Sequence, residues 1–225
     1  MAKNDFKGEV PVNYAEKCLC VLVLDVSGSM DGEPIDELNR GLQEFYDDIS
    51  NNPSLRQGLE VSIITFNHIV KTIQEPALVD QFEMPKLSAS GCTAMVNAVN
   101  AAIDKVEARK QWYKDNGMTY KRPWIILMTD GEPDDDQDVN ALASRIKDDT
   151  VQKHYQFLPI GVEDANMSIL GQIQGNMKPK KLKGTRFSDF FEWLSNSMGS
   201  VIDANQGDKI QLGDTSDFFD DWLEV

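Results

Sequence analysis

Cysteine and histidine are scarce in this chain, and both shortages argue against particular kinds of site. The 225 residues include three cysteines, too few and too unevenly placed for a disulfide framework, so a reducing compartment is the simpler expectation. Cys18 and Cys20 alternate along an apolar run and are predicted to lie in the core. Neither His68 nor His154 has a cysteine or histidine at ligand spacing, which argues against a zinc site.

Positive charge is also in short supply. Lysine and arginine number 22 against 37 acidic residues, which gives a formal net charge of -15. A negative field repels phosphate backbones and anionic membranes, so we expect no nucleic-acid or membrane partner, and basic or metal-bridged protein partners are favoured. No stretch reaches the roughly 18 consecutive apolar residues of a membrane span, and the first residues lack the apolar region of an export signal. These absences predict a cytoplasmic protein.

Hydrophobic periodicity predicts a single α/β domain. Residues 17–25 and 123–130 are almost continuously apolar, which is typical of strands buried on both faces in a parallel sheet. Further strands are predicted at 59–66, 69–73, 155–162 and 178–182, and helices at 33–50, 93–114, 138–153, 167–173 and 188–202. Because 69–73 follows 59–66 after only two residues, the two form an antiparallel hairpin. The fold class is therefore a doubly wound, mainly parallel six-stranded sheet with one antiparallel edge strand and helices on both faces.

The two ends of the chain differ from the centre in composition. We predict an N-terminal extension over residues 1–16, the domain over 17–202 and an acidic tail over 203–225, where seven acidic residues stand against Lys209. Within that tail, Phe218, Phe219, Trp222 and Leu223 alternate with acids as in a short amphipathic segment. We expect this segment to pack on the domain. The alternatives are docking on a partner, or a carboxylate offered to the metal of a neighbouring molecule.

Oxygen-bearing side chains gather where the two most apolar strands end. Just past the carboxyl end of the first strand, where open α/β sheets bind ligands, Asp25, Ser27 and Ser29 occupy alternate positions. A third hydroxyl, that of Thr93, lies at a loop-to-helix junction, and Asp130 ends the predicted strand at 123–130. The ends of neighbouring parallel strands lie close together, so these five residues can converge on one ion. Hard cations prefer such oxygen ligands, which predicts a Mg²⁺ site; Mn²⁺ and Ca²⁺ accept the same ligands.

The three segments together resemble a known metal site. DVSGS at 25–29, Thr93 in SGCTA and Asp130 in MTDG are similar to the metal-ion-dependent adhesion site of von Willebrand factor A domains, and the similarity covers roughly residues 17–202. The resemblance implies that Ser27, Ser29 and Thr93 ligate the metal directly, and that Asp25 and Asp130 act directly or through water. It also implies that an Asp or Glu of a protein partner completes the shell, and that the domain binds partners rather than catalysing a reaction.

A narrower resemblance indicates a biological setting. DVSGSMDGEPIDELNRGLQEF, VSIITFN and LSASGCTAM are similar to the bacterial tellurite-resistance-associated group of these domains, the TerY-like proteins. That resemblance implies a stress-response or conflict system in which kinases and phosphatases are partners.

Two other functions remain open at this point. A Mg²⁺-dependent phosphotransferase or phosphatase of the haloacid-dehalogenase type also starts from a strand-terminal aspartate, here Asp25. That chemistry requires an acid two residues later, and Ser27 in that place is no general acid at neutral pH. A nucleotide switch is disfavoured because no GxxxxGK[ST] loop is present. The second alternative is a metal-independent scaffold with a vestigial site.

A second group of acids imitates a calcium loop. Asp134, Asp135, Asp136 and Asp138 resemble the start of an EF-hand, but Val139 and Arg145 occupy the positions of its glycine and its twelfth-position glutamate. We interpret the group as a solvated acidic loop that caps the following helix. Its closeness to Asp130 raises the further hypothesis that it influences which partners approach the ion.

Overall fold

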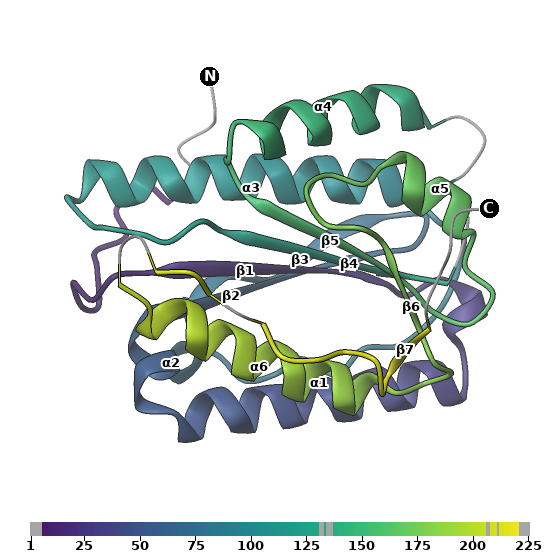
Figure 1. The fold of residues 1–225 in the computed structure, drawn as a ribbon, viewed down its shortest axis with the longest axis horizontal. Helices are drawn as coiled ribbons and strands as arrows, with labels where there is room; N and C mark the ends of the chain where they lie inside the picture. Colours follow the sequence, from purple (N-terminus) through teal and green to yellow (C-terminus); the bar gives the residue numbers. More distant parts are fainter. Residues whose placement is uncertain (1–5, 131–132, 134–136, 206–207, 211, 221–225) are drawn as a thin grey trace.

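The computed structural model describes residues 6–130, 133, 137–205, 208–210 and 212–220, and within them one sheet forms the centre of the molecule (Figure 1). Seven strands of these residues pair in the order β3-β2-β1-β4-β5-β6-β7. They are β1 (Cys18–Asp25), β2 (Leu59–Phe66), β3 (Val70–Leu78), β4 (Trp124–Thr129), β5 (Gln156–Gly161), β6 (Lys180–Leu182) and β7 (Phe219–Asp220). Strands β2, β1, β4, β5 and β6 are parallel, while β3 and β7 are antiparallel to their neighbours. The predicted doubly wound, mainly parallel fold is confirmed.

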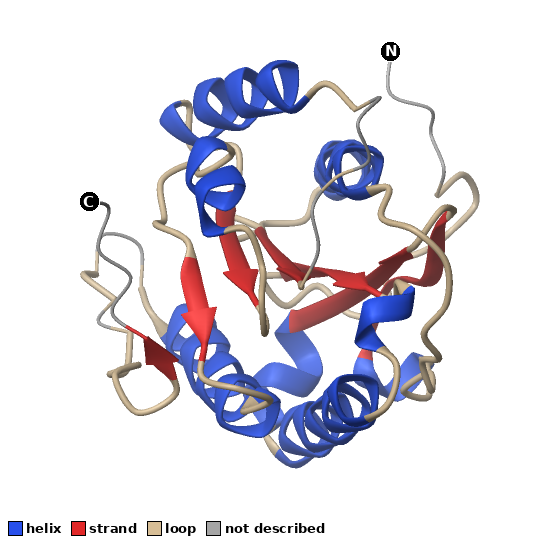
Figure 2. Cartoon of the chain, turned by 90° about the vertical axis from the view of Figure 1, so that its right-hand side faces the viewer, coloured by secondary structure: helices blue, strands red, loops and turns tan. Residues whose placement is uncertain are grey.

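Helices cover both faces of this sheet, as Figure 2 shows in a view from the end where the parallel strands finish. One face carries α3 (Met95–Asp115), α4 (Val139–Val151) and α5 (Met167–Gln172), and the other carries α1 (Glu33–Asn51), α2 (Pro53–Gly58) and α6 (Phe187–Asp203). Short 3-10 turns occur at η1 (Gly28–Met30) and η2 (Val79–Gln81). Among the residues described, no helix has both the length and the apolar content needed to cross a membrane.

The edge strand β3 is longer than the sequence predicts. The prediction ends at Ile73, yet pairing with β2 continues until Leu78 lies opposite Glu60. The ladder is irregular at Ile73, because Ile64 pairs with Thr72 whereas Ile63 pairs with Gln74. Bulges of this kind are common on edge strands, and a proline such as Pro76 is tolerated there. Pairing with β2 therefore extends the strand beyond its apolar stretch.

Two elements lie outside the prediction. After α1 ends, the Asn52 side chain accepts hydrogen bonds from Ser54 N at 3.0 Å and Leu55 N at 3.2 Å, which starts the short helix α2. At the opposite end of the chain, β7 adds a seventh strand, with Phe219 opposite Leu182 of β6. A helix cap and a two-residue strand leave no periodic signal in a sequence, so the prediction of six strands with one antiparallel edge strand omitted β7, which forms the other edge and is also antiparallel.

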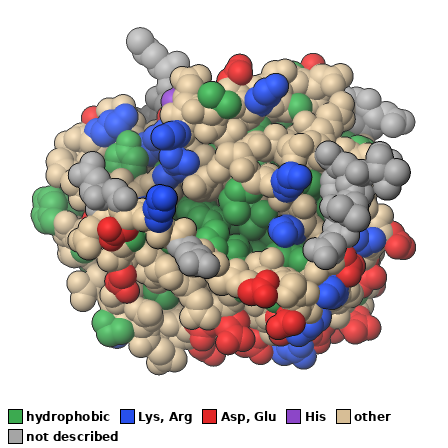
Figure 3. All heavy atoms as spheres, viewed as in Figure 1, with side chains coloured by type: hydrophobic (Ala, Val, Ile, Leu, Met, Phe, Trp, Pro, Cys, Tyr) green, Lys and Arg blue, Asp and Glu red, His purple; other side chains and the backbone are tan. Residues whose placement is uncertain are grey.

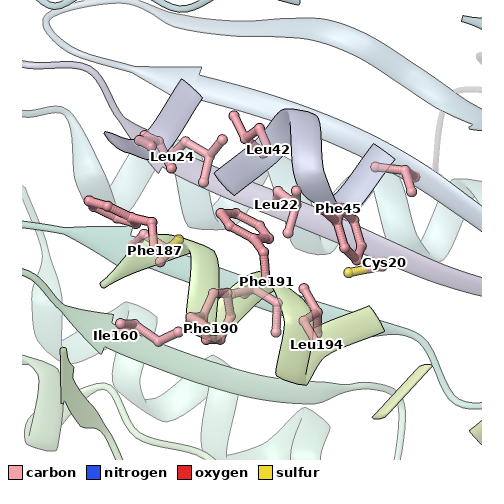
Figure 4. Packing of buried hydrophobic residues seen from close by; sticks show 14 of the residues in the cluster. Cys20, Leu22, Leu24, Leu42, Phe45, Ile160, Phe187, Phe190, Phe191 and Leu194 are labelled. Atoms are coloured by element: carbon pink, nitrogen blue, oxygen red, sulfur yellow. The ribbon is translucent and has the colours of Figure 1, made fainter. Parts of the chain in front are cut away.

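The larger part of the core lies between the sheet and helices α1 and α6 (Figure 4). Phe45 of α1 and Phe191 of α6 lie with ring centroids 5.5 Å apart above the buried side chains of β1. A Cβ added at Gly41 would lie 2.8 Å from a ring carbon of Phe191, so glycine permits the close approach of the two helices. Cys18 and Cys20 are fully buried in this cluster, as predicted, and burial raises the pKa of the Cys18 thiol to about 12.

Both ends of the described chain pack onto the domain. Near the N-terminus, Phe6 is buried in a small cluster with Trp112 of α3. Near the C-terminus, Phe218 and Phe219 are buried against α6, where Phe218 lies 6.4 Å from Trp193 between ring centroids. The predicted packing of the acidic-aromatic segment is thus confirmed for these two residues, while the predicted Trp222 and Leu223 lie outside the described residues.

Apolar side chains are exposed near the middle of the surface that Figure 3 shows, with lysine and arginine side chains close to them. A cavity of about 450 Å³ lies between Trp124, Val201 and Leu212, with Lys121 and Arg122 at its border. Lys121 is held by Glu16 at 2.9 Å, so part of this positive charge is already paired.

A buried ion pair joins β2 to α3. The guanidinium of Arg109, 2% exposed, donates from Nε and Nη2 to the two carboxylate oxygens of Glu60, each at 2.7 Å. Tyr113 donates its hydroxyl to the same carboxylate at 2.5 Å, and Glu9 accepts from Arg109 Nη1 at 2.8 Å. Although burial opposes the charge, the hydrogen bonds and the charge of Glu60 raise the pKa of Arg109 above its usual value. Arg109 therefore keeps its positive charge inside the protein.

Candidate metal site

The two strand-terminal aspartates meet because β1 and β4 are neighbours. Leu24 of β1 lies opposite Met128 of β4, so the strands end at the same level. Thr129, the last residue of β4, donates its hydroxyl to Asp25 Oδ2 at 2.5 Å, and Asp130 follows directly. The structure thus brings Asp25 and Asp130 to one point of the sheet edge, although 105 positions separate them in the sequence.

Asp25 is a buried carboxylate with two hydrogen-bond donors around it. It is fully buried, and besides Thr129 it accepts a hydrogen bond from Ser27 N at 2.9 Å. Burial raises the pKa of Asp25 to about 6, against the lowering effect of the hydrogen bonds from Ser27 and Thr129. A nearby cation would compensate the cost of this buried charge.

The two serines lie together at the start of the loop after β1. Ser27 Oγ and Ser29 Oγ are 3.0 Å apart, and Ser27 is buried whereas Ser29 is exposed. The Gly28 amide donates to Gly91 O at 2.9 Å, which ties this loop to the one that carries Thr93. The arrangement presents two hydroxyl oxygens side by side, one in the interior and one at the surface.

The loop before α3 is held at both ends by backbone hydrogen bonds. Ser90 N donates to Val26 O at 2.8 Å, and Ala94 N donates to Asn67 O at 2.7 Å. Between them Gly91 has a φ of +81°, and a Cβ there would lie 2.4 Å from Nδ1 of His68. The backbone conformation and the adjacent side chain both require glycine, which positions the buried Thr93 at the edge of the site.

Gln137 links the loop that carries Thr93 to the residues that follow Asp130, and no pattern in the sequence selects it. Its Nε2 donates to Thr93 O at 2.9 Å, while its Oε1 accepts from Val96 N at 2.7 Å at the start of α3. The same residue precedes Asp138, whose carboxylate caps α4 by accepting from Ala141 N at 2.9 Å. A polar residue in an acidic loop carries no distinctive pattern, so only the folded chain identifies this role.

One oxygen of the Asp130 carboxylate, Oδ1, is buried and accepts no hydrogen bond from any described residue. A buried acceptor without a partner costs free energy, and a carboxylate costs more than a neutral group. The predicted ligand set consists of the carboxylates of Asp25 and Asp130 and the hydroxyls of Ser27, Ser29 and Thr93, which are the oxygen ligands that hard cations prefer. The five predicted residues therefore fit a divalent cation of the Mg²⁺ type.

The acidic group that resembles an EF-hand provides no second metal site among the described residues. The capping role predicted for Asp138 is confirmed, whereas Asp134, Asp135 and Asp136 lie outside the described residues. Within the described part of the chain, no group of three or more histidine, cysteine, aspartate or glutamate side chains is arranged to hold a metal ion. The candidate site depends on hydroxyl oxygens beside its two carboxylates.

Comparison with known proteins agrees with this architecture. Residues 20–193 of the 225 match the model of the von Willebrand factor type A domain. The chain belongs to this family. The matched part of the VWA domain starts within β1 and ends within α6, so it contains Asp25, Ser27, Ser29, Thr93 and Asp130. No curated protein matches the chain.

Solved structures share the VWA fold at low sequence identity. The VWA2 protein of Sulfolobus acidocaldarius, a paralog of ArnB, is 20% identical with a TM-score of 0.55, over 82% of this chain and 46% of that one. BatB from Bacteroides thetaiotaomicron is 17% identical with a TM-score of 0.54, over 83% and 100%. The pilus adhesin SpaC from Lactobacillus rhamnosus GG is 14% identical with a TM-score of 0.61, over 84% and 30%. This chain thus spans about half the length of the Sulfolobus protein, and these likenesses show the fold alone.

Proposed function

We propose that this VWA domain is a metal-dependent protein-interaction module. It holds Mg²⁺ through Asp25, Ser27, Ser29, Thr93 and Asp130, and an Asp or Glu of the partner completes the coordination shell. The observation that carries the proposal is the buried Oδ1 of Asp130, which has no hydrogen-bond partner among the described residues, together with the buried carboxylate of Asp25. A cation bound by two carboxylates and three hydroxyls would supply the positive charge that these two acidic groups lack.

The residues of the proposed site have different roles in binding the metal and the partner. Asp25 and Asp130 supply the negative charge that attracts the ion, and Thr129 and Ser27 N fix the orientation of Asp25. Ser29, at the surface, leaves the outer side of the site open to a partner. When bound, the metal supplies residual positive charge and a free coordination position, and a partner carboxylate then adds both charge pairing and specificity.

The wider setting is also a proposal. Similarity of three segments to the TerY-like group favours a cytoplasmic role in bacterial tellurite resistance or another stress or conflict response, with kinase or phosphatase partners. A non-enzymatic role is favoured because Ser27 occupies the position where a haloacid-dehalogenase-type enzyme requires an acid.

Calorimetric titration with Mg²⁺, Mn²⁺ and Ca²⁺ tests the site. Wild type is expected to bind at least Mg²⁺, and Asp25→Ala is expected to abolish the binding heat while leaving the circular dichroism spectrum unchanged. Asp115→Ala is the matched control, because Asp115 is an exposed aspartate at the far end of α3. If wild type binds none of the three ions, or if Asp25→Ala binds them as tightly, the proposal fails and the metal-independent scaffold becomes the better description.

A further inference from the structure

A cavity beside the candidate metal site has the chemistry of a peptide-binding surface. It measures about 250 Å³, lies between β3 and residues 85–90, and is called here the β3 pocket; its lining includes Val26, Ile69, Lys71, Ile73, Lys86 and Ser90. Val26 stands between Asp25 and Ser27, and Ser90 precedes Gly91 in the loop that carries Thr93. The hydrogen bond from Ser90 N to Val26 O joins these two loops. The pocket therefore shares two loops with the metal site.

The apolar part of the β3 pocket is exposed to solvent. Ile69 is 48% exposed and Ile73 is 37% exposed, while Leu87 and Val26 form buried wall. The irregular pairing of β3 occurs at Ile73, which lines the pocket together with Lys71. Exposed aliphatic side chains that line a concave surface offer contact area to an apolar group of a partner. The pocket can receive an apolar side chain.

The charge of the β3 pocket is opposite to that of the whole protein. Among its described lining residues, both charged ones are lysines, Lys71 and Lys86, whereas the chain carries a net charge of -15. Both are exposed, and neither forms an ion pair with another described residue. Two uncompensated lysines favour an acidic occupant, because complementary charge selects the partner and speeds its approach.

We propose that the β3 pocket determines which partners the metal site accepts. A partner segment places one Asp or Glu on the metal, inserts an apolar side chain between Ile69 and Ile73, and pairs a second carboxylate with Lys71 and Lys86. One short segment reaches both places, because the pocket and the metal site share the loops at Val26 and Ser90. This inference rests on the proposed function, and it specifies the partner as an acidic and apolar peptide segment.

The test is selection of a random peptide library displayed on phage against the immobilised protein in Mg²⁺. Peptides eluted by EDTA are sequenced, and their affinities are measured by fluorescence polarisation. The test variant is Lys71→Glu/Lys86→Glu. The control is Lys147→Glu/Lys178→Glu, which changes the net charge equally at two exposed lysines outside the pocket.

The possible outcomes distinguish a failure of the β3 pocket's role from a failure of the proposed function. We expect Mg²⁺-dependent peptides that share two acids and an apolar residue, and we expect them to bind the test variant about tenfold or more weakly than the control, at unchanged Mg²⁺ affinity. Equal binding to the test and control variants overturns the role of the β3 pocket and leaves the proposed function standing. If wild type selects no Mg²⁺-dependent peptide although it binds Mg²⁺, the partner-bridging function is overturned together with this inference.

Discussion

Replacing Arg109 by methionine removes a buried charge from its partner while keeping the length of the side chain. In the wild-type protein Arg109 and Glu60 are 2% and 3% exposed and share two hydrogen bonds of 2.7 Å. The guanidinium also lies 3.9 Å from the centroid of the Trp112 ring. After the substitution, Glu60 keeps only the hydroxyl of Tyr113 among these contacts, so a buried carboxylate loses its counter-charge.

The expected cost follows from this burial. Breaking a buried ion pair by removing one partner destabilises proteins by about 3–5 kcal/mol, whereas an exposed pair contributes about 0.2–1 kcal/mol. Arg109→Met is therefore expected to lower the free energy of unfolding by about 3–5 kcal/mol. Arg56→Met is the matched control, because its pair with Asp80 joins two side chains that are 48% and 58% exposed. Its cost is expected to stay below about 1 kcal/mol.

Urea denaturation of a double-mutant cycle provides the measurement. Because Arg109→Met/Glu60→Gln removes both charges, it is expected to cost much less than the sum of the single substitutions, with a coupling of about 2 kcal/mol or more. Mg²⁺ affinity is expected to stay unchanged, since the pair contacts neither strand end of the candidate site. If Arg109→Met costs no more than Arg56→Met, or if the cycle is additive, the explanation by buried charge is refuted.

Two further substitutions concern the metal site. Asp25→Asn in EDTA is expected to raise the free energy of unfolding at pH 7.5 by about 1–3 kcal/mol, because burial raises the pKa of Asp25 to about 6. The pKa of Asp25 is higher in the folded protein than in the unfolded chain, so the free energy of unfolding of wild type falls as pH rises from about 4 to about 6. An advantage of the variant that is equal at pH 4.5 and pH 7.5 would contradict the explanation. Gly91→Ala is expected to weaken Mg²⁺ binding in calorimetry, because an added Cβ meets His68 in the loop of the site. Gly117→Ala serves as its control, since φ is +66° there but no atom lies within 4 Å; equal Mg²⁺ affinities of the two variants would show that the loop tolerates the change.

Local patterns were sufficient to predict most of the fold. The apolar runs that end at Asp25 and Asp130 predicted two central parallel strands, and the structure places them side by side. Such runs are informative because a strand that is covered by helices on both faces buries nearly all of its side chains, and those side chains are therefore apolar. The helical stripes predicted α1, α3, α4 and α6 for a similar reason, since one face of each helix is buried against the sheet. The same reasoning predicted that Asp25 and Asp130 lie at one edge of the sheet.

The features that depended on tertiary structure are contacts between residues far apart in the sequence. The ion pair of Glu60 with Arg109 joins residues 49 positions apart, and the hydrogen bond from Gln137 to Thr93 joins residues 44 positions apart. Neither contact produces a periodic pattern in the sequence. Strand β7 exists because β6 offers it an unpaired edge, not because two residues have a strand propensity of their own.

The sequence by itself determined the fold class, the family and a set of five oxygen-bearing residues, because burial imposes composition along each strand and helix. Only the tertiary structure decided the surroundings of that set. Three features of the described residues depend on how loops far apart in the chain are arranged: the Asp130 oxygen without a hydrogen-bond partner, the link from Gln137 to Thr93, and the position of the lysines in the β3 pocket. Such contacts depend on where the strands end in space, and no local pattern encodes that position.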